Sequence, residues 1–155
     1  MPNQNRACCF SGHRDLKGID LAELRLRLAE AIGSKICSGV DRFVCGGAVG
    51  FDTLAAEEVI KVKQKYPWVT LKLILPYRTF GQSRNAGIMG DVDEVEAVCE
   101  EYEPGCLHRR NRRMVEESRY LICYCREAKG GTAFTVREAE KLNLEVANLA
   151  EAFSD

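Results

Sequence analysis

Two glycine-rich segments of the chain could bring bare backbone against a phosphate group. Each stands between an apolar run and a helical pattern, and together they contribute Gly46, Gly47, Gly50, Gly130, Gly131 and Thr132. Glycine lets the backbone approach a ligand closely. The free N–H groups and the dipole at a helix N-terminus attract an anion. A single Gly-Gly pair would be an ordinary tight turn, but two pairs in this setting predict a phosphate-bearing ligand.

Asp52 adds a negative charge at the edge of the first glycine segment. It could cap a helix expected to begin at Thr53, or it could accept hydrogen bonds from the hydroxyl groups of a ribose. If the protein is an enzyme, Asp52 is the candidate catalytic carboxylate. Thr132 has a similar pair of roles, because its hydroxyl could cap the following helix or donate to the anion. Together these residues point to a phosphorylated ribose.

A third turn and a basic cluster supply further polar side chains. The turn contains Ser11, Gly12, His13 and Arg14, directly after an apolar run. The cluster HRRNRR spans residues 108–113, and arginine binds phosphate through two parallel hydrogen bonds. Arg110 and Asn111 are predicted to face inward, whereas the other arginines are expected to pair with nearby carboxylates.

The pattern of apolar runs predicts five strands, at residues 6–11, 42–45, 69–75, 120–125 and 145–150. Helices are predicted after Asp20, which forms a capping pair with Glu23, and at residues 53–65, 91–103, 110–118 and 132–143. Residues 77–90 are the least regular segment and are predicted to form a flexible loop over a site. Strands that are apolar throughout and alternate with helices are typical of a doubly wound α/β sandwich with a parallel sheet.

The strand order 3-2-1-4-5 would bring the three turns to one crevice at the carboxyl ends of the strands. The 155 residues fit a single domain, residues 1–155. A net charge of −1 gives no general attraction for nucleic acid or an anionic membrane. No apolar stretch is long enough to cross a bilayer, and residues 1–6 lack the features of a signal peptide, so a cytoplasmic protein is expected.

The eight cysteines do not form a C-x-x-C pair, and five of them lie within apolar runs. They are expected to act as small hydrophobic residues, and no metal site is predicted. The glycine segments also differ from the common nucleotide motifs. G-G-x-x-G is not the dinucleotide fingerprint G-x-G-x-x-G, and no G-K-[ST] follows, which disfavours hydride transfer and P-loop ATP hydrolysis.

The segments CCFSGHR, GGAVGFDTLAAEEV, LPY, YEPGCLHRRNRRMVEES and KGGTAFTVREA resemble the YpsA-like branch of the SLOG superfamily of bacterial proteins. The resemblance implies a Rossmann-like three-layer fold and a nucleotide-derived ligand such as NAD, ADP-ribose or an AMP-like compound. It implies no required cofactor. The implied ligand-binding residues are those of the three turns together with Asp52, Arg110 and Asn111. The tryptophan that the family usually has after LPY has no counterpart here.

The same superfamily contains the Lonely Guy phosphoribohydrolases, whose motif P-G-G-x-G-T-x-x-E places a glutamate three residues after the threonine. Here that position is Thr135, and Glu138 lies about 9 Å further along the helix axis. A nucleotide sensor is therefore preferred. The alternative is an N-glycosidase or phosphoribohydrolase that uses Asp52, assisted by His13 or Arg14. Nucleic-acid binding, by analogy with the related DNA-processing protein A, is a third and weaker hypothesis, and a homodimer is expected by analogy with Lonely Guy proteins.

Overall fold

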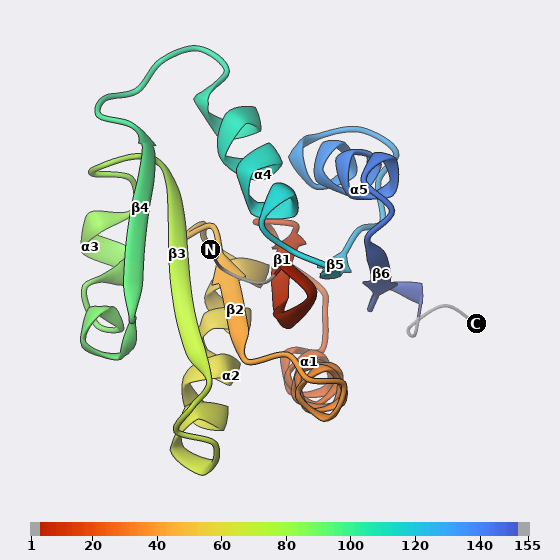
Figure 1. The fold of residues 1–155 in the computed structure, drawn as a ribbon. Helices are drawn as coiled ribbons and strands as arrows, with labels where there is room; N and C mark the ends of the chain where they lie inside the picture. The colour runs from red at the N-terminus through yellow and green to blue at the C-terminus, as the bar shows by residue number, and fades with distance from the viewer. Residues whose placement is uncertain (1–3, 152–155) are drawn as a thin grey trace.

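The computed structural model describes residues 4–151, which form one parallel sheet between two layers of helices (Figure 1). The strands are β1 (Ala7–Gly12), β2 (Arg42–Cys45), β3 (Thr70–Tyr77), β4 (Glu94–Cys99), β5 (Tyr120–Tyr124) and β6 (Glu145–Asn148). They lie in the order β4-β3-β2-β1-β5-β6, and every neighbouring pair is parallel. The doubly wound α/β class is therefore confirmed. The order predicted for five strands is also correct, but a sixth strand, β4, lies at the edge of the sheet beyond β3.

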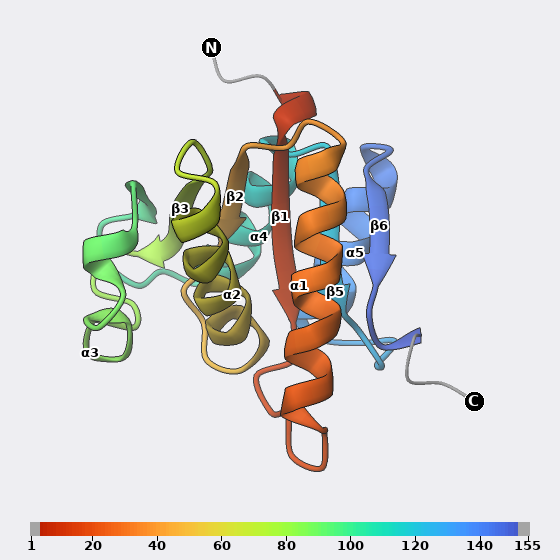
Figure 2. The same ribbon diagram turned by 90° about the horizontal axis from the view of Figure 1, so that it is seen from below.

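The helices cover both faces of the sheet, as Figures 1 and 2 show. The long helices are α1 (Leu21–Cys37), α2 (Phe51–Lys65), α4 (Cys106–Glu116) and α5 (Gly131–Lys141). Helices α1 and α2 lie on one face, and α4 and α5 on the other. Successive residues of a strand point to opposite faces. In β1, accordingly, Cys8 and Phe10 pack in the core with Leu24 of α1, whereas Cys9 packs in a second core with Met114 of α4.

Helix α1 begins where the sequence predicts. Asp20 is its N-cap residue, and its carboxylate accepts a hydrogen bond of 3.1 Å from the backbone N–H of Glu23. This bond satisfies one of the free N–H groups of the first turn. No helix among residues 4–151 is long and apolar enough to cross a membrane.

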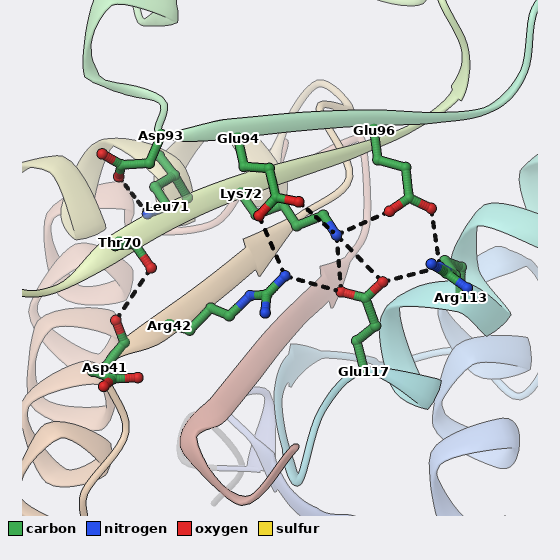
Figure 3. Close-up of polar contacts among 10 residues, drawn as sticks. All are labelled: Asp41, Arg42, Thr70, Leu71, Lys72, Asp93, Glu94, Glu96, Arg113 and Glu117. Atoms are coloured by element: carbon green, nitrogen blue, oxygen red, sulfur yellow. Dashed lines mark hydrogen bonds and ion pairs between the residues drawn. The ribbon is translucent and has the colours of Figure 1, made fainter. Parts of the chain in front are cut away.

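The prediction of a helix at residues 91–103 is wrong, because this segment forms the edge strand β4. Val92, Val95 and Cys99, spaced three and four apart, resemble a helical face, but Glu94-Val95-Glu96-Ala97 also alternates with a period of two. The segment forms a strand because the alternation places both glutamates on one face of the sheet, where they pair with Lys72. Figure 3 shows Glu94 and Glu96 pointing to the same side as Lys72 of the adjacent strand. The register pairs Lys72 with Glu94, so the carboxylates of β4 lie over the lysine.

Lys72 is only 3% exposed, and its ammonium group is at the centre of this charged cluster. It lies 2.9 Å from Glu96 Oε1 and 3.0 Å from Oε1 of Glu117, which follows α4. Arg113 of α4 lies 3.0 Å from Glu96 and 2.9 Å from Glu117, as Figure 3 also shows. Burial alone would lower the pKa of Lys72, but the hydrogen bonds to Glu96 and Glu117 raise it above its ordinary value. The cluster ties β4 and α4 to the middle of the sheet with charged groups.

The segment 77–90 is structured along its length and not a simple loop. It contains the short helix α3 (Gln82–Asn85) and leads into the 3-10 turn η2 (Met89–Asp91). Asn85 is buried, and its amide donates a hydrogen bond of 3.0 Å to the carbonyl oxygen of Gly47. The segment is therefore fixed against the turn that follows β2. The 3-10 turn η1 (Gln4–Arg6) precedes β1.

Candidate functional site

The turns after β1, β2 and β5 meet at one pocket of about 300 Å³ at the carboxyl ends of the strands. They meet because β1 lies between β2 and β5 in the sheet. Helix α4 closes one side of this pocket, which we call the central pocket. Most of the residues predicted from the sequence line it, namely Ser11, Gly12, His13, Arg14, Asp52, Arg110, Asn111, Gly130, Gly131 and Thr132.

The other three predicted residues, Gly46, Gly47 and Gly50, do not line the central pocket, and each packs against protein groups. A Cβ on Gly46 would lie 2.5 Å from Nη1 of Arg110 and 2.9 Å from Oδ2 of Asp52. Gly50 has a φ of +86°, and a Cβ there would meet the backbone of Arg14 at 2.7 Å. The glycines of this turn therefore make room for other residues of the site, and the pocket lining in this part of the chain is Ala48 and Asp52.

Asp52 and Arg110 are buried groups of opposite charge that both line the central pocket and attract each other electrostatically; we call them the buried charged pair. They are 6% and 6% exposed. The N–H of Ala48 donates a hydrogen bond of 3.3 Å to Oδ2 of Asp52, and Nη1 of Arg110 donates to the carbonyl oxygen of Gly46. Burial raises the pKa of Asp52 above its ordinary value, and the charge of Arg110 with the N–H groups of Ala48 and Gly46 offsets this only in part. Burial likewise lowers the pKa of Arg110, against the attraction of Asp52.

The structure also shows that Asp52 and Thr132 are not helix caps. Helix α2 begins at Phe51 with Gly50 as the N-cap residue, so Asp52 lies inside the first turn. Helix α5 begins at Gly131 with Gly130 as its N-cap residue, and no side chain caps it. Neither side chain is therefore used to cap a helix, and both line the central pocket.

Three polar groups that line the central pocket make no hydrogen bond within residues 4–151. They are the hydroxyl of Ser11, the amide nitrogen of Asn111 and the hydroxyl of Thr132. The amide oxygen of Asn111 is already occupied, because it accepts a hydrogen bond of 2.7 Å from Nε of Arg110. Buried polar groups in proteins are nearly always paired. The residues that carry these three groups line the central pocket and are each less than a tenth exposed, so the groups are available to a ligand.

His13 connects the turns after β1 and β5. Its Nε2 accepts a hydrogen bond of 2.8 Å from the backbone N–H of Arg126, and its ring packs edge-on against Tyr124 with centroids 6.0 Å apart. Its carbonyl oxygen accepts a hydrogen bond of 3.1 Å from the N–H of Phe51, at the start of α2. One residue thus holds all three turns in place.

Several pocket residues were not predicted as site residues from the sequence. They are Ala48, Phe80, Leu107, His108, Met114 and Lys129. Phe80 comes from the segment after LPY, where the resemblance would have placed a tryptophan, and Arg110 lies over its ring at 5.5 Å from the centroid. The absence of that tryptophan was the signal that could have singled out Phe80. Lys129 directly precedes the second glycine pair, and this position in the sequence could have identified it as a residue of the pocket.

Glu138 does not replace the catalytic glutamate of Lonely Guy enzymes. It does not line the central pocket, and its carboxylate pairs with Arg112 at 3.0 Å and with Lys141 at 2.9 Å. Thr135, at the position of that glutamate, is fully buried and donates a hydrogen bond of 2.9 Å to the carbonyl oxygen of Gly131. Within residues 4–151, no group of three or more His, Cys, Asp or Glu side chains is placed to hold a metal ion.

Comparison with curated proteins finds relatives of low identity. A UPF0398 protein of Bacillus pumilus is 29% identical over 129 residues, which cover 77% of this chain and 67% of the relative. The UPF0398 protein BH1768 of Halalkalibacterium halodurans is 27% identical over 113 residues, covering 66% of this chain and 60% of the relative. The chain therefore spans about two thirds of the length of these relatives.

Solved structures of DNA processing protein A have a similar fold. The protein from Helicobacter pylori, which binds single-stranded DNA, superposes with a TM-score of 0.66 and 18% identity over 92% of this chain and 64% of that one. The protein from Streptococcus pneumoniae gives a TM-score of 0.66 and 16% identity over 92% of this chain and 49% of that one.

A family model gives the most specific match. The model named YpsA, described as the YspA SLOG family, matches residues 15–150, which include the turns after β2 and β5 and most of the secondary structure. The chain therefore belongs to the YpsA family of SLOG proteins.

Proposed function

We propose that this protein binds a nucleotide-derived ligand, such as NAD, ADP-ribose or AMP, in the central pocket and acts as a sensor. The observation that carries the proposal is the set of unpaired polar groups around a buried charged pair. The N-terminus of α5 and the free hydroxyl of Thr132 would receive a phosphate, as helix N-termini do. Asp52 would accept hydrogen bonds from ribose hydroxyls. The pocket volume of about 300 Å³ is at the lower end of the usual range for small-molecule sites.

Titration calorimetry with AMP, ADP-ribose and NAD tests the proposal. At least one of them should bind with a defined stoichiometry and raise the unfolding temperature. Thr132→Val keeps the shape of the side chain but removes its hydroxyl, and should weaken binding about tenfold, as expected for a hydrogen bond to a charged group. Thr70→Val at the start of β3, outside the pocket, is the matched control. Absence of binding by all three compounds would refute the proposal.

A second candidate function is hydrolysis of the N-glycosidic bond of such a ligand. The raised pKa of Asp52 favours it, because carboxyl groups with perturbed pKa values in pockets are often catalytic. Prolonged incubation of protein with the bound nucleotide, followed by chromatography, would reveal free base. If the protein cleaves the nucleotide and Asp52→Asn abolishes the cleavage, the protein is an enzyme. If the nucleotide stays unchanged, the result supports the sensor.

Binding of single-stranded nucleic acid is a third candidate, because DNA processing protein A of Helicobacter pylori has the same fold and binds single-stranded DNA. The net charge of −1 does not favour it. Fluorescence anisotropy with a labelled oligodeoxynucleotide, repeated at two salt concentrations, would detect it.

A further inference from the structure

The lysine and arginine side chains of this protein are almost all engaged. Of the 22 in the chain, all of which lie within residues 4–151, 18 make an ion pair, a hydrogen bond or a contact with an aromatic ring. The side chains of the remaining four make none of these. They are Arg14, Lys17, Arg126 and Lys129, and all four lie on the turns that follow β1 and β5.

Three of these cations line a second hollow beside the central pocket. This hollow, which we call the outer groove, has a volume of about 550 Å³ and is lined by His13, Arg14, Asp15, Lys17, Ile19, Tyr124, Arg126 and Glu127. Its cations come from both turns, since Arg14 and Lys17 follow β1 and Arg126 follows β5. The groove and the central pocket share His13 and Arg14. A molecule that fills both must therefore pass Arg14.

The charges of the two hollows favour an anion that spans them. Their linings contain five lysine or arginine residues and three carboxylates, in a chain whose net charge is −1. One carboxylate, Asp52, is at the buried base of the central pocket. Another, Asp15, accepts a hydrogen bond of 2.9 Å from the N–H of Lys17, which orders the turn. The surplus of two positive charges matches the two negative charges of a pyrophosphate linkage, which carries one on each phosphate.

We propose that the outer groove is a second ligand subsite and that the ligand is a pyrophosphate-linked dinucleotide or nucleoside diphosphate sugar, not a mononucleotide. This inference rests on the proposed function. The first phosphoribosyl group occupies the central pocket. Arg14 contacts the pyrophosphate where the two hollows join, and Lys17 and Arg126 hold the distal half. Together the hollows fall in the upper part of the roughly 300–1,000 Å³ range of ligand sites.

Calorimetry with AMP and ADP-ribose tests the subsite, because the two compounds share one half and differ in the other. ADP-ribose should bind at least tenfold more tightly than AMP to the unmodified protein. The double variant Lys17→Gln/Arg126→Gln should weaken ADP-ribose binding by ten- to a hundredfold, as expected for two charge-assisted contacts, and change AMP binding less than threefold. Both side chains are exposed and unpaired, so the variant should keep its unfolding temperature.

The charge-matched control is Lys65→Gln/Lys141→Gln, which removes two exposed cations away from the linings of both hollows and should leave both affinities unchanged. Equal weakening of AMP and ADP-ribose by the groove variant, or no weakening of either, would overturn the subsite while the proposed function stands. Failure of the unmodified protein to bind either compound would overturn both. If an oligodeoxynucleotide displaces ADP-ribose from the unmodified protein but binds poorly to the Lys17→Gln/Arg126→Gln variant, the groove is a nucleic-acid site. That result would also overturn the inference.

Discussion

The imidazole of His13 and the backbone N–H of Arg126 are joined by a hydrogen bond of 2.8 Å between residues 113 positions apart. This bond joins the turns after β1 and β5 at the boundary between the central pocket and the outer groove. Within residues 4–151 the side chain of Arg126 makes no hydrogen bond, ion pair or aromatic contact, so the position of this turn depends on its backbone. His13 is therefore a positioning residue for the turn that carries Arg126 and Lys129.

His13→Phe tests this role, because phenylalanine can keep the packing on Tyr124 but cannot accept a hydrogen bond. We expect a loss of about 1 kcal/mol in the free energy of unfolding, the usual net value of one hydrogen bond. Hydrogen exchange should accelerate at the amide of Arg126 and its neighbours, while the amides of α2 beyond its first turn serve as the internal control. Unchanged exchange at Arg126 would show that the turn is held by other contacts.

Gly46→Ala should damage the site, because the added Cβ would lie 2.5 Å from Arg110 and 2.9 Å from Asp52. Overpacking of this kind typically costs about 1–3 kcal/mol, and the displaced charged pair should also weaken nucleotide binding. Gly33→Ala in α1 is the matched control. A Cβ there meets nothing within 4 Å, so the change should stabilise the helix by up to about 1 kcal/mol. A Gly46→Ala protein as stable as the Gly33→Ala protein would contradict this account.

Asp52 gives a prediction about pH. Its pKa in the folded protein is raised above the ordinary 3.8, so the folded state holds this proton more tightly than the unfolded state does. The stability that this carboxyl contributes is complete below about pH 3.8 and is lost as the pH rises through the raised pKa. As the pH rises from about 4 through the raised pKa, the unmodified protein should therefore lose free energy of unfolding relative to the Asp52→Asn protein. Urea unfolding of both proteins from pH 4 to pH 9 measures the difference, and a difference independent of pH would contradict the prediction.

Lys72→Met should destabilise the protein, but by less than the roughly 3–5 kcal/mol of an uncompensated buried charge, because Glu96 and Glu117 keep their ion pairs with Arg113. Adding Glu117→Gln should restore part of the loss, since it removes one carboxylate from a cluster that has lost one cation. Lys61→Met is the control, because the side chain of Lys61 is 62% exposed and its ion pair with Glu58 should contribute less than about 1 kcal/mol. Strictly additive effects of Lys72→Met and Glu117→Gln would show that the two groups are not coupled.

Most of the sheet and the turns could be predicted from local patterns, because apolar strands and glycine turns are encoded within a few residues. Strand β4 could not. Residues 94–99 form a strand because Glu94 and Glu96 pair with Lys72, a charged residue within the buried strand β3. The same lysine also pairs with Glu117, which is distant in the sequence. A lysine in an otherwise apolar run requires buried carboxylates nearby, and Glu94 and Glu96 at a spacing of two could have supplied them.

The pocket residues were predictable where they belong to the turn after a strand or to the first turn of the next helix, as with His13, Asp52 and Thr132. The role of Gly46 was not, because the group it accommodates, Arg110, comes from α4 on the opposite side of the pocket. Phe80 was missed for a similar reason. Its position depends on the packing of residues 77–90 against the turn after β2, which involves the side chain of Asn85 and no local motif.

The pairing of the central strand β1 determines when the site can exist. Its neighbour β2 follows within the first third of the chain, but its other neighbour β5 aligns Tyr120 with Cys8 and Tyr124 with Gly12. A chain made from its N-terminus therefore completes one wall of the pocket early and the opposite wall only when residues 129–132 have emerged from the ribosome. A ligand of this pocket could then bind only after most of the domain has been synthesised, and it could not guide the earlier steps of folding.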